Sequence, residues 1–253
     1  MKATPCPIFF SPEGISQTHD GERILLNGID LSVHKGQKIS IVGPNGCGKS
    51  TLLSILAGAL VPQEGTIQRA KGISVGYLQQ EPSFPAGLTA RQAVFTGDSP
   101  LARALRDYEE AVRRVETAGA PEGGGPGGGG LAQAQAALAL ERAMRQMDAL
   151  EAWDAEARAH EMLGKLGCDG QDFLDTPVEL LSGGQRKRLA LAQMLVEEPD
   201  LLLMDEPTNH LSAEGVSWLT DRLGGRGVTL VMVRARPAIA IPRLVHSHVP
   251  GSI

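Results

Sequence analysis

Residues 39–60 read ISIVGPNGCGKSTLLSILAGAL, and this stretch decides the fold. An apolar, β-branched run at 39–42 leads into a turn rich in glycine. A helical pattern then follows over residues 50–60, where Val61-Pro62 ends it. Similar apolar runs recur between helical patterns, as is typical of a mostly parallel sheet; they cover residues 73–78, 201–204 and 229–233. The sequence therefore predicts an α/β fold.

The turn itself, GPNGCGKST at 43–51, fits the phosphate-binding pattern G-x-x-x-x-G-K-[ST]. Its glycines let the backbone curl so that N–H groups point at phosphate oxygens, helped by the positive end of the following helix. Lys49 would reach the β- and γ-phosphates, and the Ser50 hydroxyl would bind Mg²⁺. A chance match is the alternative, and the position between strand and helix argues against it. The predicted nucleotide-binding residues are Gly43, Pro44, Asn45, Gly46, Cys47, Gly48, Lys49, Ser50 and Thr51.

A second candidate site is the acidic pair in LLLMDEP, residues 201–207, where Asp205 and Glu206 end an apolar strand. Neighbouring residues at a strand end point in different directions, so the two carboxylates can take different roles. We expect Asp205 to bind Mg²⁺, and Glu206 to polarise the water that attacks the γ-phosphate. The alternative is a pair of solvated acids at a strand end. The presence of Lys49 in the same chain favours the catalytic interpretation.

The middle of the chain has a different character. Between residues 89 and 166 it is rich in Ala, Glu and Arg, and apolar side chains recur at helical spacing in two groups: Leu101, Leu105, Tyr108, Val112 and Val115, then Leu140, Met144, Met147, Leu150, Trp153 and Ala157. The pattern predicts two helices packed as a hairpin, joined by a mobile, disordered linker at 119–130, GAPEGGGPGGGG. We therefore expect a helical subdomain at 89–176 inside a discontinuous core of 1–88 and 177–253.

Composition narrows the class of protein. The 253 residues are 42% hydrophobic and carry a net charge of -5, which argues against nucleic-acid binding by the whole surface. No run approaches the roughly 18 apolar residues of a membrane span, and the first residues lack a secretory signal, so we expect a cytoplasmic protein without membrane spans. The three cysteines, Cys6, Cys47 and Cys168, are too scattered to indicate a disulfide framework or a zinc site.

LSGGQ at 181–185 is a further glycine motif, and it precedes a helical pattern. Ser182 is a natural helix N-cap, and alone the motif could be no more than a cap. Set between the phosphate-binding loop and the acidic pair, it resembles the signature of the ATP-binding cassette (ABC) superfamily. In that superfamily the first of these motifs is called Walker A and the acidic pair Walker B. DEPTNHL (205–211) together with LSGGQRKRLALAQ (181–193) resembles the ABC-F branch, over roughly residues 8–233.

The resemblance implies a P-loop NTPase cassette: a mostly parallel core sheet, an N-terminal antiparallel β part and an inserted helical subdomain. It also implies that two cassettes pair head to tail around ATP and Mg²⁺. The signature residues would then serve the ATP of the partner; they are Ser182, Gly183, Gly184 and Gln185. Gln80 would contact Mg²⁺ and the attacking water, with Gln79 as the alternative register. His19 would stack on adenine, unless it is simply an exposed loop histidine.

The chain departs from the family pattern in two places. Ser212 stands where an acid is expected, and Arg234-Ala235-Arg236 stands where the family has Ser-His-Asp. Because the missing histidine contacts the γ-phosphate in the family, we expect slower hydrolysis. His246 and His248 lie too far along the chain to replace it and are expected to be tail residues.

One explanation of the second departure is a frameshift. Arg-Ala-Arg-Pro can be encoded so that reading one base later gives x-His-Asp-Arg, which would make this chain a first cassette, truncated or frameshifted near Val233. A naturally short protein is the alternative. Sequencing the locus for a second cassette downstream tests the hypothesis.

The leading functional hypothesis is Mg-dependent ATP hydrolysis by an ABC-F-type cassette that acts through cassette pairing and is associated with the ribosome in translation. Its catalytic residues would be Glu206, Lys49 and Gln80, and its metal ligands Ser50, Gln80 and Asp205. An ATP-binding subunit of a transporter is the second hypothesis. A third is a regulatory module that binds ATP without hydrolysing it.

Overall fold

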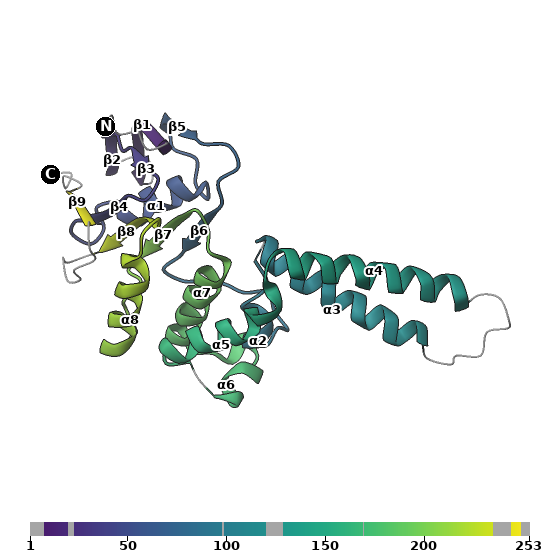
Figure 1. Ribbon diagram of the computed structural model, residues 1–253. Coiled ribbons are helices and arrows are strands. Elements are labelled where there is room, and N and C mark those ends of the chain that lie inside the picture. Colours follow the sequence, from purple (N-terminus) through teal and green to yellow (C-terminus); the bar gives the residue numbers. More distant parts are fainter. Residues whose placement is uncertain are drawn as a thin grey trace.

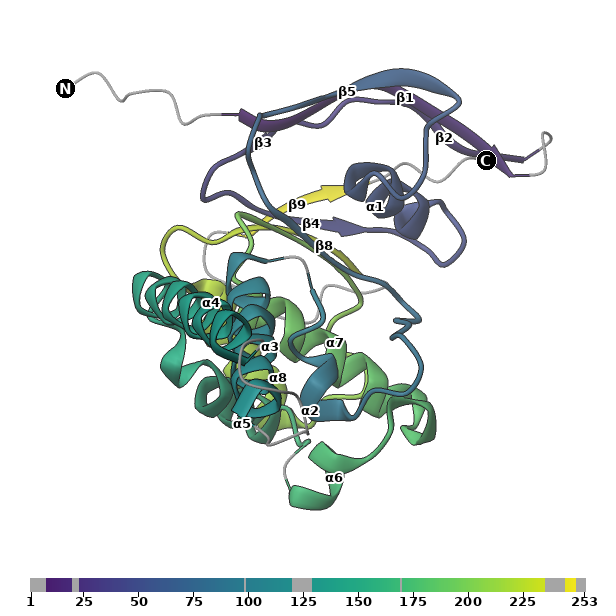
Figure 2. The same ribbon diagram turned by 90° about the vertical axis from the view of Figure 1, so that its right-hand side faces the viewer.

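The computed structural model describes residues 8–19, 23–97, 99–119, 129–168, 170–234 and 244–248. These residues form two sheets and a helical layer, stacked as Figure 2 shows: an antiparallel sheet lies over helix α1, the parallel sheet follows, and most helices cover its far face. The predicted α/β architecture is confirmed.

The parallel sheet has the strand order β6-β7-β8-β4-β9. Its members are β6 (Val75–Leu78), β7 (Leu201–Asp205), β8 (Thr229–Arg234), β4 (Lys38–Val42) and β9 (Leu244–His248). All neighbouring pairs run parallel, which confirms the four predicted strands. Strand β9 was not predicted. His246 and His248 belong to this edge strand beside β4, so their expected place in a tail is wrong.

The antiparallel sheet comes from the N-terminal part of the chain. Strand β1 (Ile8–His19) pairs with β2 (Arg23–Ile29), β3 (Val33–His34) and β5 (Glu64–Arg69). Between the two sheets lies α1 (Lys49–Ala57), whose buried leucines and isoleucine pack with side chains from both sheets; the core includes Phe10, Ile15, Leu52, Leu53, Ile55, Leu203 and Val231.

Helix α1 ends earlier than the predicted residue 60. Gly58 adopts φ 78°, a left-handed conformation that glycine reaches without strain, and its N–H donates to the carbonyl of Ile55. The N–H groups of Ala59 and Leu60 both donate to the carbonyl of Ser54. The helix therefore stops at a glycine C-cap, three residues before the break that Pro62 predicted.

The opposite face of the parallel sheet is covered by helices (Figure 1). The helices nearest the sheet are α7 (Gly183–Glu197) and α8 (Ala213–Gly224). Beyond them, α5 (Ala155–Lys165) packs on α7 and α8, and α2 (Ala90–Ala93) packs on α7 and on α6 (Gln171–Asp175). A 3-10 turn (Val178–Leu180) comes shortly before α7. A second apolar core forms there, in which Leu189, Leu195 and Leu219 pack with Met204 and Met232 of the sheet.

Helices α3 (Pro100–Gly119) and α4 (Gly129–Ala149) form the predicted hairpin, which projects from the helical layer in Figure 1. The second helix does not continue to Ala157 as its pattern predicted. Glu151 has φ 49°, which interrupts the helix, and a 3-10 turn (Ala152–Asp154) precedes α5. The interruption lets the Trp153 ring contact Tyr108 edge-on, with the centroids 5.2 Å apart.

The predicted linker falls partly outside the described residues. Gly119 ends α3 and Gly129 begins α4, so the ends of the 119–130 segment are helical, and residues 120–128 lie outside the described part of the chain. The division into a core and a subdomain at residues 89 and 176 stays a prediction.

Candidate nucleotide-binding site

The glycine-rich turn lies between β4 and α1, at the carboxyl end of a fully buried strand. Gly46 and Gly48 have φ 78° and 91°. A Cβ atom on Gly48 would lie 2.7 Å from the carbonyl oxygen of Leu25, so no larger residue fits there. Gly48 also directly precedes the first turn of α1, where unpaired N–H groups favour an anion.

Lys49 is the first residue of α1 and is only 6% exposed. Its ammonium donates to the carbonyl oxygens of Gly43 and Pro44, at 2.9 and 2.7 Å. The positive charge is therefore held against the loop that would surround a phosphate. Ser50, the predicted metal ligand, is exposed on the next position of the helix.

Strand β8 brings the loop and the acids together. Val42, just before the loop, lies beside Arg234, while Asp205 lies beside Val233 on the other side of the same strand. Asp205 is 2% exposed, and its Oδ2 atom has no hydrogen-bond partner within the part of the chain that the structure describes. A buried carboxylate oxygen without a partner is costly, and a hard cation such as Mg²⁺ satisfies it. Asp205 thus fits its predicted role as a metal ligand.

Glu206 follows at a sharp turn with φ 46°, and its backbone N–H donates to the carbonyl of Val233. Its carboxylate accepts a hydrogen bond from the amide of Asn209. Because this turn ends the regular alternation of side chains along β7, the Glu206 side chain need not point directly opposite to that of Asp205. Two adjacent acids can then act on different atoms.

The structure leaves two further predictions open, namely those for the glutamine after β6 and for His19. Gln79 and Gln80 both follow β6, which pairs with β7, and both are exposed, so the choice between the two registers stays open. His19 is the last residue of β1 and pairs with Arg23; its side chain lies outside the described residues. Its contact with adenine stays a prediction.

The signature residues lie on another element, at the start of α7. The Ser182 hydroxyl accepts a hydrogen bond from the N–H of Gln185, and the Gln185 side chain accepts one from the N–H of Ser182, which is a capping box. Ser182 and Gly183 are exposed. A Cβ atom on Gly184 would lie 3.5 Å from that of His210, so this end of α7 touches the loop that carries Glu206.

Two buried cations near the acids were not predicted from the sequence. Burial lowers the pKa of Lys187, and the charges of Asp205 and Glu206 raise it back in part. Burial likewise lowers the pKa of Arg234, which the charge of Glu206 opposes, and its guanidinium donates to the Thr208 hydroxyl at 2.8 Å. For Arg234 the sequence did contain a signal, because the strand TLVMVR is mostly apolar and ends in a basic residue.

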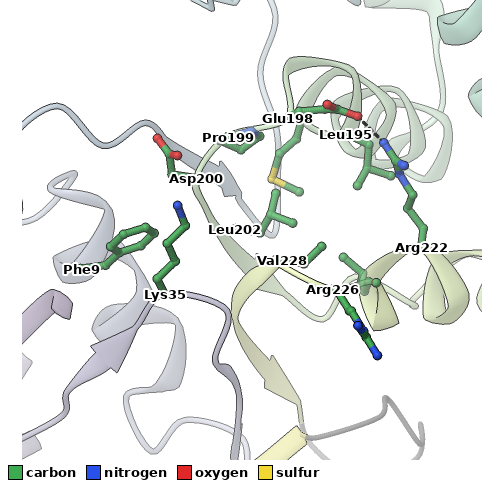
Figure 3. A pocket seen from close by; sticks show the side chains of 14 residues that line it. Phe9, Lys35, Leu195, Glu198, Pro199, Asp200, Leu202, Arg222, Arg226 and Val228 are labelled. Atoms are coloured by element: carbon green, nitrogen blue, oxygen red, sulfur yellow. Dashed lines mark hydrogen bonds and ion pairs between the residues drawn. The ribbon is translucent and has the colours of Figure 1, made fainter. Parts of the chain in front are cut away.

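A pocket of about 440 Å³ lies elsewhere, at the amino ends of the parallel strands (Figure 3). Lys35 points toward Asp200 there, and Arg222 pairs with Glu198. Asp200 accepts hydrogen bonds from the N–H and hydroxyl of Ser74, which lower the pKa of its carboxyl. These groups already have partners, and the pocket opens on the edge opposite Lys49 and Asp205, so we do not assign it to the nucleotide.

Cys47 provides a chemical test of the site because it is a free, partly exposed thiol inside the loop. We expect bound ATP to slow its alkylation, since the phosphates would cover it. Mass spectrometry of the Cys47 peptide with and without Mg-ATP measures the effect. The Lys49→Ala variant is the control and should show no protection; equal labelling of the unaltered chain in both conditions would contradict the placement.

The chain is similar to known proteins in both sequence and fold. A family profile described as "ABC transporter" matches residues 26–209. An uncharacterised ABC transporter ATP-binding protein, YfmR of Bacillus subtilis, is 38% identical over 82% of this chain and 30% of its own length. The energy-dependent translational throttle protein EttA of Mycobacterium tuberculosis is 38% identical over 80% of the chain and 34% of its own.

A third relative is the tylosin resistance ATP-binding protein TlrC of Streptomyces fradiae, 37% identical over 88% of this chain and 39% of its own. The chain thus spans between 30% and 39% of the length of these relatives.

Solved structures show the same fold. The dimeric structure of MJ0796, a bacterial ABC transporter cassette, has a TM-score of 0.59 at 22% identity and covers 94% of both chains. The ADP- and phosphate-bound dimer of MJ0796 has a TM-score of 0.55 at 21% identity, over 88% of this chain and 87% of that one.

Proposed function

This chain belongs to the ATP-binding cassette family, and from that premise we propose that it binds ATP with Mg²⁺ in the loop 43–51 and hydrolyses it while paired with a second cassette. One observation carries the proposal: a buried lysine held against the glycine loop lies at the same edge of the sheet as a buried carboxylate oxygen of Asp205 that has no hydrogen-bond partner among the described residues. These are the groups that a metal-bound triphosphate needs.

In this mechanism the loop amides and Lys49 hold the β- and γ-phosphates. Mg²⁺, when bound, offsets the charge of those phosphates, and Ser50, Asp205 and Gln80 would hold it. Glu206 would orient the attacking water and accept its proton, with Gln80 as a second contact to that water. His19 would contribute to adenine binding.

Pairing is supported by the exposed start of α7. Residues 182–185 are the signature, and in the proposed pair they close over the ATP of the partner, while Lys49 and Glu206 act on the ATP of their own chain. The similar dimeric cassettes support head-to-tail pairing only through their fold. With Arg234 at the end of β8 and Ser212 at the N-cap of α8, we infer that hydrolysis is slower than in a cassette with the full family pattern.

We further propose a cytoplasmic, ribosome-associated role. It is supported by relatives such as EttA, whose name describes it as a translational throttle protein, and by the ABC-F wording of DEPTNHL. No helix in the described ranges is both long and apolar enough to cross a membrane. The transporter hypothesis is favoured by the description of the family profile and predicts a membrane protein in a pulldown, whereas ours predicts ribosomes.

Pairing and turnover are tested together by complementation. Gly183→Arg places a bulky side chain on the signature, where a Cβ atom meets no described atom within 4 Å, so the fold should tolerate it. We expect Gly183→Arg and Lys49→Ala each to be inactive alone. Mixed, they should recover about a quarter of the unaltered activity, because half of the pairs contain one intact site.

The specific activity of the unaltered chain should also rise with protein concentration as pairs form. Steady-state phosphate release reports both measurements. A mixture that stays inactive while the unaltered chain turns over would refute pairing in trans. Binding without any phosphate release would favour the regulatory module instead.

A further inference from the structure

The loop 206–210 carries Glu206, and its first and last residues have positive φ angles, a backbone conformation that residues other than glycine rarely adopt. Glu206 has φ 46° and His210 has φ 70°. Such conformations persist only where the surroundings determine them. Within the loop, the N–H of Asn209 donates to the carbonyl of Glu206 at 3.2 Å, and the Asn209 side chain donates to the Glu206 carboxylate. These local bonds do not anchor the loop to the rest of the protein.

Besides the bond from the Glu206 N–H to the carbonyl of Val233, two arginine side chains from other elements anchor the loop. Arg188 of α7 donates to the carbonyl of His210 at 3.3 Å. Arg234, the last residue of β8, donates to the Thr208 hydroxyl at 2.8 Å. The loop is therefore held at its middle by the central strand and at its end by the signature helix.

Arg234 also brings a charge to this place. It is 5% exposed, and burial of a guanidinium is unfavourable unless a charge or hydrogen bonds compensate for it. The charge of Glu206 opposes the lowering of the Arg234 pKa by burial, and the charges of Asp205 and Glu206 both oppose the lowering of the Lys187 pKa.

We propose that Arg234 is a positioning residue for Glu206. It fixes the 206–210 loop through Thr208, and its charge holds the Glu206 carboxylate in place beside the sheet edge. The proposal deepens the function proposed above, because it concerns the carboxylate assigned to the attacking water. It gives Arg234 a task of its own at a position where the family pattern has serine.

A double-mutant cycle on thermal stability tests the charge pairing directly. The proteins are the unaltered chain, Arg234→Met, Glu206→Gln and the double variant, all free of nucleotide and metal. We expect Arg234→Met to lower Tm by roughly 5 °C when Glu206 is present, and by less than about half of that in the Glu206→Gln background, where the negative charge that compensates for the buried guanidinium is already absent. Calorimetry measures both shifts.

The controls separate charge from packing. Lys38→Met removes another buried cation, one that donates to the carbonyl of Gly225 at the opposite end of the sheet, and should shift Tm equally in both backgrounds. Arg234→Lys keeps the charge, so it should keep most of the coupling to Glu206, and it serves if Arg234→Met does not fold.

Equal Tm shifts for Arg234→Met in the two backgrounds would overturn the proposal and leave Arg234 as a purely structural contact of Thr208. The cycle needs no ATP. Its outcome is therefore independent of whether the chain binds or hydrolyses nucleotide.

Discussion

Lys49→Ala should weaken ATP binding about 100-fold or more, because a buried ammonium beside the phosphates makes charge-assisted hydrogen bonds that alanine cannot replace. The ammonium now donates to Gly43 and Pro44, so the substitution also removes the two bonds that fix the start of the loop. Calorimetric titration with Mg-ATP measures the loss. The folded state should survive, since α1 keeps its apolar contacts with both sheets.

Lys35→Ala is the matched control for this titration. Lys35 lies at the amino edge of the parallel sheet, facing Asp200 rather than the glycine loop, and its loss should leave the affinity unchanged (Figure 3). If the Lys49→Ala protein bound ATP as tightly as the unaltered chain, the loop 43–51 would not be the triphosphate site.

Glu206→Gln should separate binding from hydrolysis. Glutamine keeps the size of the side chain and can keep a hydrogen bond with Asn209, but it cannot accept the proton of the attacking water. We expect turnover to fall by about 10²- to 10⁴-fold while ATP affinity changes little, so that ATP-bound pairs accumulate. Single-turnover phosphate release and size-exclusion chromatography with Mg-ATP measure the two effects.

The exposed Glu214 on the first turn of α8 supplies the control, and Glu214→Gln should behave as the unaltered chain. An unchanged turnover rate in Glu206→Gln would show that another group activates the water. A fall in affinity equal to the fall in rate would instead assign Glu206 to ATP binding.

Much of the fold follows from local sequence signals. The strand–turn–helix unit at 39–57 and the strand that ends at Asp205 are both predictable, because a short apolar run, a glycine turn and a cap residue each restrict the backbone directly. The helix ends were predicted less well. Glu151 interrupts a continuous apolar period with a left-handed residue, and periodicity carries no information about such a turn.

The surroundings of the acids could not be predicted for a different reason. Lys187 and Arg234 come from a helix and a strand that are distant in sequence from each other, and their proximity to Asp205 and Glu206 exists only in the folded sheet. Motif spacing finds groups that share one loop. It does not reveal a charged side chain that lies on a neighbouring strand or helix and comes close only in the folded protein.

The geometry at the base of the α3–α4 hairpin bears on how chains of this kind can diverge. Ala104 near the start of α3 packs with Met147 near the end of α4 and with Ala152 just beyond it, so the chain leaves and re-enters the helical layer at one point. Helical turns could be gained or lost beyond this junction without moving Lys49 or Asp205. The hairpin is thus a place where insertions and deletions change the length of the projection and leave the nucleotide-binding residues in position.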